Sequence, residues 1–200
     1  MELKEAIFSR RSIRKFKPDP VPGEHIYEML EAARLAPSGS NLQPFRFVVI
    51  RSEKAREQLA SATLKFVTEA PVVIACCTDL TAMDGRKERM KELAESGAFT
   101  GATMGKVNPA DYADRWKDSN AIPAYLNLNT AIAIEHLILR ATDLGLGTCW
   151  VMLFKQKEIK DLLDLGEQYA VVALIPVGYP DQDPGPRPRL PMEQILLKEI

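Results

Sequence analysis

Five basic residues stand within eight positions near the start of the chain, in the segment Arg10–Lys17. The guanidinium groups of Arg10, Arg11 and Arg14 can each bind a phosphate through two parallel hydrogen bonds, and the hydroxyl of Ser12 is a further donor. A run of charge is also common on a solvated surface, where lysine would serve as well as arginine. The choice of arginine favours an anion-binding site, and the solvated surface remains the alternative.

A turn-rich loop follows at residues 36–45, with the sequence APSGSNLQPF. It carries the hydroxyls of Ser38 and Ser40 and the carboxamides of Asn41 and Gln43. A carboxamide presents a donor and an acceptor together, which suits the amide-like edge of a heterocycle better than a phosphate alone. An ordinary helix end followed by a turn is the alternative.

A third candidate segment is GLGTCWV at residues 145–151. Its two glycines would let the backbone approach a ligand closely, although glycines at the end of a helix are also ordinary caps. The segment is not a GxGxxG dinucleotide fingerprint, because no strand precedes it and the third glycine is missing.

A fourth candidate lies near the C-terminus, where Arg187 and Arg189 alternate with prolines in the segment GPRPRLP. Proline restricts the backbone, so these two guanidinium groups would be presented from a stiff, extended scaffold. A solvated tail without a ligand is the alternative.

The cysteines Cys76, Cys77 and Cys149 show no CxxC spacing, and the chain has only two histidines, so no metal site is expected. A thiol nucleophile would need an activating base, which the sequence alone does not place next to any cysteine. Because free cysteine is among the most buried residue types, a structural role is favoured. A thiol enzyme using Cys149 or the adjacent pair stays open as an alternative.

Hydrophobic periodicity predicts the elements that must position these residues. Helices are expected over residues 2–10, 24–35, 53–69, 122–144 and 156–165. Strands are expected over residues 45–50, 72–77, 148–154 and 169–177, and 72–77 is apolar throughout, as a strand covered on both faces would be. The proline-rich segments 11–23 and 180–191 are expected to be extended.

The charge balance argues against some classes of partner. The chain has 26 Lys and Arg residues against 27 Asp and Glu residues, so no global field draws it to nucleic acid or to an acidic membrane. No segment approaches the roughly 18 apolar residues of a membrane span, and the first residues lack the order of a signal peptide. We therefore expect a single domain over residues 1–200, a cytoplasmic location, and neither a nucleic-acid nor a membrane partner.

In their order along the chain, the arginine segment, the APSGSNLQP loop, GLGTCWV and the terminal PRPRLPME resemble the nitroreductase family of FMN-dependent oxidoreductases. The resemblance runs from Leu3 to about Ile195 and is weakest over residues 82–121, where no periodicity is legible. One departure is VMLF at residues 151–154, where the family commonly has a glycine-bearing continuation.

The resemblance implies an α+β fold, with a mixed, mainly antiparallel sheet wrapped by helices. It also implies an intertwined homodimer with two FMN sites at the subunit interface. Residues 180–200 would form an extended tail across the partner subunit, and residues 82–121 a variable lid or cover.

The flavin contacts of the family carry over by matching position. Arg10, Arg11, Ser12 and Arg14 would hold the FMN phosphate, ribityl chain and pyrimidine edge, and Arg187 and Arg189 would complete the phosphate clamp. From the other subunit, Pro37, Ser38, Gly39 and Ser40 would line the ring, with Asn41 and Gln43 near its polar edge. Cys149, Trp150 and Val151 would lie along the isoalloxazine.

The implied activity is hydride transfer from NADH or NADPH to flavin N5, followed by reduction of a small-molecule acceptor, such as a nitroaromatic or a quinone, in a ping-pong cycle. The flavin carries the chemistry, so no catalytic side chain is expected. The aromatic residues Phe99, Tyr112, Trp116 and Tyr125 could cover the open flavin face or serve only in packing. A noncatalytic FMN- or phosphometabolite-binding protein and a dehalogenase-type relative of the family remain alternatives.

Overall fold

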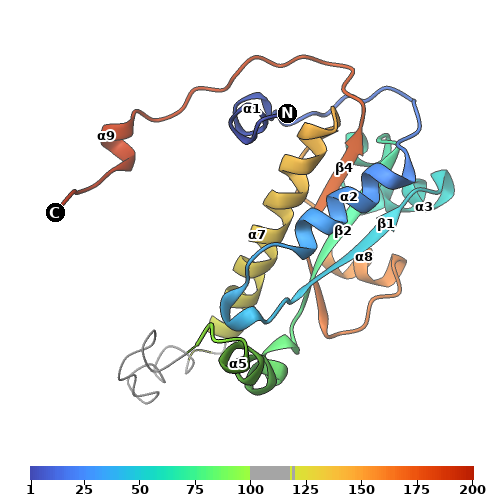
Figure 1. Cartoon of the computed structure of the whole chain (residues 1–200). Coiled ribbons are helices and arrows are strands. Elements are labelled where there is room, and N and C mark those ends of the chain that lie inside the picture. Colours follow the sequence, from blue (N-terminus) through green and yellow to red (C-terminus); the bar gives the residue numbers. More distant parts are fainter. Residues whose placement is uncertain (100–117, 119) are drawn as a thin grey trace.

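The computed structural model describes residues 1–99, 118 and 120–200 (Figure 1). The helices are α1 (Leu3–Ser9), α2 (Gly23–Arg34), α3 (Glu53–Gln58), α4 (Lys65–Thr68), α5 (Arg86–Glu95), α7 (Ala121–Asp143), α8 (Gln156–Leu162) and α9 (Met192–Ile195). Short 3-10 helices are η1 (Gly39–Asn41), η2 (Leu59–Ser61) and η3 (Ala82–Gly85). The strands are β1 (Phe45–Ile50), β2 (Val72–Asp79), β3 (Gly147–Thr148) and β4 (Tyr169–Gly178).

The four strands form one sheet in the order β1-β2-β4-β3, and every pairing between these strands is antiparallel. The one parallel contact among the described residues is an isolated bridge between Ser12 and Thr148. The α+β class and the mainly antiparallel sheet predicted from the sequence are therefore confirmed.

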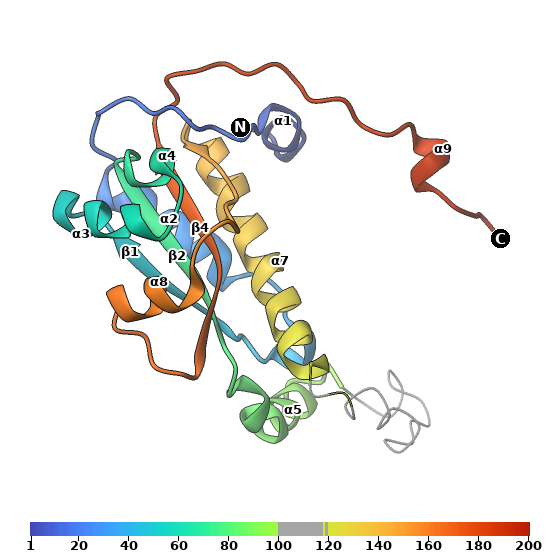
Figure 2. The ribbon, with the colours of Figure 1, turned by 180° about the vertical axis from the view of Figure 1, so that it is seen from behind.

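Strand β2 lies at the centre of the core and is buried on both faces, as its apolar composition predicts. Successive side chains of a strand point to opposite faces. Accordingly Ile74 and Cys76 join the core cluster that contains α2 and α7, whereas Val73 and Ala75 join the cluster that contains α4 and α8. Figures 1 and 2 show these two helical layers from opposite sides of the sheet.

Helix α7 is the longest helix that the structure describes, and it packs against α2 and the sheet. Its buried side chains include Leu126, Ala133, Ile134 and Leu137. Burying one large aliphatic side chain of this kind contributes about 1.5–3 kcal/mol. α7 is therefore a rigid axis, and the candidate functional segments lie near its two ends.

The single helix expected over residues 53–69 is wrong. The chain forms α3, then η2, then α4, with extended backbone at Leu64 between the last two. In the interruption the Ala62 carbonyl accepts a hydrogen bond from Lys155 N–H at 2.8 Å, and the Thr63 hydroxyl donates to the Leu153 carbonyl at 3.2 Å. The first bond takes a backbone carbonyl that a continuous helix would have paired within itself, and the second holds the Thr63 side chain against the same distant segment.

The strand expected over residues 148–154 is wrong in extent, because β3 ends at Thr148. The chain rejoins the sheet only at Val151, which exchanges both backbone hydrogen bonds with Leu174, at 3.1 and 2.9 Å. By the alternation of an antiparallel ladder, the next such pair would join Cys149 to Pro176, and proline has no N–H to donate. The gap leaves residues 149 and 150 outside the ladder.

The C-terminal segment leaves β4 after Gly178 and runs extended past α1, ending beyond α9 away from the sheet (Figures 1 and 2). Most of its side chains are exposed, and they include the large apolar residues Leu196, Leu197 and Ile200. The extended conformation matches the expectation from its prolines.

Candidate functional site

The basic segment Arg10–Lys17 lies alongside the short strand β3. The N–H of Ile13 donates to the Thr148 carbonyl at 2.8 Å, and the Ile13 side chain is buried. The Ile13 Cγ1 atom is 2.7 Å from where a Cβ on Gly147 would stand, so the close approach of the two segments requires glycine at that position. The anchored segment leaves the side chain of Arg14 exposed.

Arginines from opposite ends of the chain meet at one cavity of about 270 Å³. Its polar lining side chains are Arg10, Arg11, Ser12, Arg187 and Arg189, and the apolar side chains of Ile7 and Phe8 and the segment 184–186 complete it. No acidic side chain is among these lining residues. We name this cavity the arginine pocket.

The arginine pocket holds cationic groups that are not neutralised. Within the part of the chain that the structure describes, none of its four arginines makes an ion pair with a carboxylate. Arg11 Nη1 instead donates to the backbone carbonyls of Phe8 and Arg10, at 2.7 and 2.9 Å. By contrast, Lys15 in the same segment pairs with Asp181 at 2.6 Å. Convergent unpaired guanidinium groups are suited to a phosphate.

A second cavity, of about 230 Å³, adjoins the arginine pocket, because Arg10 and Ser12 line both. Its remaining lining residues are Glu135, Ile138, Thr148 and Trp150. Trp150 is half-buried there and follows the gap in the sheet described above. The two adjoining cavities could accommodate a ligand with an anionic group at one end and a flat polar ring at the other.

Cys149 and Val151 flank Trp150 and are both buried. Burial raises the pKa of the Cys149 thiol, while the nearby Arg14 guanidinium and a hydrogen bond with Ser12 act in the opposite direction. The Arg14 guanidinium itself lies over the ring of Phe66 in α4, 5.9 Å from the ring centroid. Phe66 and Cys149 pack on one side of the sheet, and Trp150 packs on the other.

The two adjacent cysteines lie inside the sheet. Burial raises the pKa of the Cys76 thiol well above its ordinary value, and it raises the pKa of Cys77 to about 11. A thiol acts as a nucleophile in its ionised form, so neither group is activated near neutral pH. The burial expected for the cysteines is confirmed, and the structure gives the thiol-enzyme alternative no support.

The loop from Pro37 to Gln43 lies elsewhere, beside the N-terminal half of α7. The Gly39 N–H donates to Asn129 Oδ1 at 2.6 Å, and the Ser38 hydroxyl accepts from the Gln43 N–H at 2.9 Å. A Cβ on Gly39 would overlap the hydroxyl of Tyr125, so this position also requires glycine.

The loop has an unusual backbone. Ser40, Asn41 and Gln43 have φ angles of 53°, 52° and 48°, in the left-handed region that residues with a Cβ rarely adopt. Such conformations cost roughly 1–3 kcal/mol each and persist only where the surroundings enforce them, often at binding sites. The loop therefore depends on the contacts that hold it.

The loop and the arginine pocket are at opposite ends of α7. Tyr125 packs against the loop, whereas Glu135 lines the second cavity. These residues are ten positions apart, which corresponds to about 15 Å along a helix. One copy of the chain thus brings together Arg10, Arg11, Ser12, Trp150, Arg187 and Arg189, with Arg14 beside them, and does not bring Pro37, Ser38, Gly39, Ser40, Asn41 or Gln43 to them.

The aromatic residues expected near the site divide into two groups. Phe99 is half-buried just after α5, and Tyr125 contacts the Gly39 turn. Tyr112 and Trp116 lie outside the described residues, as do all of residues 100–117 and residue 119 of the segment 82–121 that the sequence predicts as a lid.

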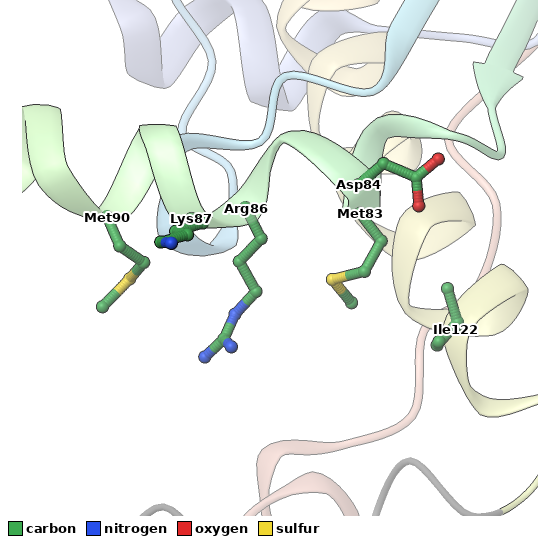
Figure 3. Close-up of a pocket in the computed structure, with 6 residues that line it drawn as sticks. All are labelled: Met83, Asp84, Arg86, Lys87, Met90 and Ile122. Carbon is green, nitrogen blue, oxygen red and sulfur yellow. The ribbon is translucent and has the colours of Figure 1, made fainter.

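A further cavity, of about 520 Å³, lies on the outer side of η3 and α5. Met83, Arg86 and Met90 project toward it on the same side, next to Ile122 at the start of α7 (Figure 3). Asp84 and Lys87 also line it. Because α5 packs against η1, this α5 cavity stands beside the loop rather than beside the arginine pocket.

Comparison with known proteins agrees with this geometry. Residues 7–179 match the model of the nitroreductase family. The chain belongs to the nitroreductase family. An NADH dehydrogenase of Thermus thermophilus is 32% identical over 199 residues, which cover 98% of this chain and 96% of the relative.

Two further similar proteins extend the comparison to structure and to a second activity. A protein of Exiguobacterium sibiricum that was crystallised in complex with FMN is 26% identical and has a TM-score of 0.80, covering 98% of this chain and 96% of its own. An iodotyrosine deiodinase of Thermotoga neapolitana is 25% identical over 189 residues, covering 94% of this chain and 92% of the relative. The predicted nitroreductase fold is confirmed.

Four residues of this nitroreductase-family chain near the candidate site are not found by motif analysis. Asn129 and Glu135 lie within an apolar helix, where a polar side chain is itself a signal of a specific partner. Met83 and Met90 are seven residues apart with basic residues between them, which is the spacing of one helical face. That pattern was obscured because the surrounding segment has no sustained periodicity.

Two kinds of feature are absent from the described residues. No helix there is long and apolar enough to cross a membrane. No group of three or more His, Cys, Asp or Glu residues there could hold a metal ion.

Proposed function

We propose that this protein is an FMN-dependent NAD(P)H oxidoreductase that acts as a homodimer. The observation that carries the proposal is the arginine pocket, where four unpaired guanidinium groups from both ends of the chain converge on one cavity. The pocket fits the phosphate of FMN in charge and in donor chemistry, because no acidic side chain lines it. The FMN complex of the Exiguobacterium sibiricum relative supports the same cofactor.

The cofactor would be held along the two adjoining cavities. Arg10, Arg11, Arg187 and Arg189 would bind the phosphate, and Ser12 and Thr148 would lie along the ribityl chain toward Trp150. Arg14, whose guanidinium lies over the Phe66 ring, would turn from there toward the pyrimidine edge of the flavin. When bound, FMN would supply hydride acceptance and delivery at its N5 atom.

The chain's own residues would tune that chemistry rather than perform it. Negative charge develops at the N1–C2 edge of a flavin on reduction, and a fixed guanidinium group there stabilises it. Arg14 is suited to this role, because it is exposed and is not engaged in an ion pair among the described residues. No side-chain nucleophile is needed.

A second copy of the chain would complete each site. The loop from Pro37 to Gln43 contacts Tyr125 and Asn129, which are about 15 and 9 Å along α7 from Glu135 of the second cavity. A second subunit would bring its own loop against a ligand held in that cavity. Large apolar side chains are exposed where such a subunit would pack, on α1, on one face of α7 and on the tail. They are Leu3, Ile7, Phe8, Leu128, Ile132, Leu196, Leu197 and Ile200.

We assign the approach of the electron acceptor to the side of the loop that carries the α5 cavity. Met83, Met90 and Ile122 offer apolar contacts to an aromatic compound. The two cations Arg86 and Lys87 outnumber the one carboxylate, Asp84, so the lining offers net positive charge to an anionic substituent. An aromatic acceptor that bears a carboxylate or sulfonate would use both features.

The test is direct. The purified protein should be yellow or should bind added FMN, and anaerobic NADH or NADPH should bleach the flavin. Steady oxidation of the nicotinamide with a nitroaromatic or a quinone would distinguish an enzyme from a noncatalytic flavin protein. Absence of FMN binding by the dimer would overturn the proposal.

A dehalogenase is the second candidate, and the iodotyrosine deiodinase relative is the finding that favours it. Release of iodide from iodotyrosine by the reduced protein, with no turnover of nitroaromatics or quinones, would identify that activity.

A further inference from the structure

The polar side chain of Asn129 is nearly completely buried, with 4% of its surface exposed, in the middle of the apolar helix α7. Both ends of its amide are used. Its Oδ1 atom accepts the Gly39 N–H at 2.6 Å, and its Nδ2 donates to the Tyr125 carbonyl at 2.7 Å. One amide therefore links the Gly39 turn to the helix that supports it.

The turn that Asn129 holds is otherwise kept in place mainly by packing, since η1 lies against α5 and Leu42 is buried. Three of its residues, Ser40, Asn41 and Gln43, are in the left-handed region. The side-chain hydrogen bonds of Ser38 and Gln43 stay within the loop, and the exposed side chain of Arg46 donates to the Gln43 carbonyl at 2.9 Å. Among the hydrogen bonds of the described residues, the one from Gly39 to Asn129 ties the loop backbone to another element through a buried side chain.

Tyr125 restricts the turn from the same side. Its hydroxyl occupies the space that a Cβ on residue 39 would need, so the turn can lie this close to α7 only if residue 39 is glycine. The Asn129 amide also donates to the carbonyl of Tyr125. The Asn129 side chain is therefore bonded both to the turn and to the residue whose ring limits the turn.

We propose that Asn129 is a positioning residue that sets the backbone of the Gly39 turn for contact with the flavin held by the other subunit. This inference rests on the proposed function. Asn129 itself does not touch the flavin; it fixes the direction of loop groups that do. Its substitution therefore changes the environment of the flavin as well as its affinity.

An asparagine is specifically suited to this position. Gly39 requires an acceptor, and the Tyr125 carbonyl, which also accepts the backbone N–H of the helix, has a second lone pair for a donor; an amide supplies one of each. Leucine has nearly the same shape and supplies neither. An ionised aspartate would accept from Gly39 but would place a second acceptor against the Tyr125 carbonyl. A protonated aspartate would satisfy both partners.

The neighbouring residue provides a matched control. Thr130 is also buried on α7, and its hydroxyl accepts a hydrogen bond from the Thr78 hydroxyl at 2.7 Å, with no contact to the loop. Asn129→Leu and Thr130→Val each remove buried hydrogen bonding from adjacent positions of one helix. Only the first affects the Gly39 turn.

The experiment compares Asn129→Leu, Asn129→Asp and Thr130→Val with the wild-type dimer. We measure FMN affinity, the reduction potential and visible spectrum of the bound flavin, and the melting temperature of the FMN-free protein. Asn129→Leu is expected to weaken FMN binding by about ten-fold or more and to shift the spectrum and potential. Thr130→Val is expected to lower the melting temperature while leaving affinity, spectrum and potential unchanged.

Asn129→Asp keeps the test informative if Asn129→Leu does not fold. Its FMN affinity, taken relative to wild type at the same pH, should rise toward that of wild type as the pH falls and the aspartate is protonated. A pH-independent ratio, or flavin properties equal to wild type in Asn129→Leu, would overturn the inference. If the wild-type protein binds no FMN, the proposed function fails instead, so the two failures are distinguishable.

Discussion

The two ends of α7 carry two different kinds of candidate recognition surface. Near its C-terminal end lie α1 and the extended terminal segments of the chain (Figure 1). Unpaired cationic side chains of these segments line the arginine pocket. Near its N-terminal end, the Gly39 turn presents backbone groups that a buried amide and a tyrosine hold in place. The first surface selects by charge, and the second selects by geometry.

The difference predicts how each surface responds to substitution. Arg187 and Arg189 are exposed, so removing them changes the charge of the pocket with little effect on packing. Gly39 and Asn129 are hydrogen-bonded to each other where the turn meets α7, so changing either one alters the position of the turn backbone. Riboflavin, which is FMN without the phosphate, separates the two effects, because only FMN can use the arginine pocket.

The largest effect is expected for the double variant Arg10→Ala with Arg187→Ala. A hydrogen bond to a charged group contributes about 1.5–3 kcal/mol, so losing two should weaken FMN binding by about 100-fold or more. Riboflavin affinity should change much less, and the melting temperature of the FMN-free protein should stay near that of wild type. Fluorescence titration with each flavin provides the measurement.

Lys15→Ala is the matched control, since Lys15 belongs to the same basic segment but pairs with Asp181. It should leave the FMN-to-riboflavin ratio unchanged. An equal loss of affinity for the two flavins in the double variant would show that the arginine pocket does not bind the phosphate.

An intermediate effect is expected for Gly39→Ala. The added methyl group would overlap the Tyr125 hydroxyl, and overpacking of this kind costs about 1–3 kcal/mol. We expect FMN and riboflavin to lose affinity by the same factor, about ten-fold, because the turn would contact the flavin ring that both share. The measurement is again the paired titration.

Gly85→Ala is the control for this substitution, because a Cβ there meets nothing within 4 Å and the φ angle is −77°. It should bind both flavins as wild type does. If Gly39→Ala weakened the binding of FMN but not of riboflavin, the proposal that the Gly39 turn contacts the ring and the arginine pocket binds the phosphate would be wrong.

The same contrast explains which parts of the molecule could be predicted from the sequence. The arginine segments could be predicted as anion sites because the guanidinium group itself binds anions. Strands β1 and β4 could be predicted because each is marked by a short apolar run of consecutive residues. The meeting of Arg10 with Arg187 required the family resemblance, since no local pattern connects positions so far apart.

The features that could not be predicted from the sequence depend on contacts between residues far apart in the chain. The break between η2 and α4 follows from the pairing of Ala62 and Thr63 with residues 153–155, and the gap after β3 follows from Pro176 on the neighbouring strand. Asn129 was hidden for the same reason, because its partner Gly39 is 90 positions away. Propensity describes neighbours in sequence and cannot identify such partners.

The smallest expected effect concerns the α5 cavity and adds a third surface to the comparison. Lys87 lines that cavity and is exposed, so Lys87→Glu should disfavour an anionic aromatic acceptor while leaving FMN affinity unchanged. Because interactions between exposed charges contribute about 0.2–1 kcal/mol, kcat/KM for nitrobenzoate should fall by about two- to five-fold relative to that for neutral nitrobenzene. Lys91→Glu, on the same helix but paired with Glu95 and outside the cavity lining, is the control. If both variants changed the ratio equally, the effect would come from the general charge of α5, and the acceptor would have to approach the flavin from another side.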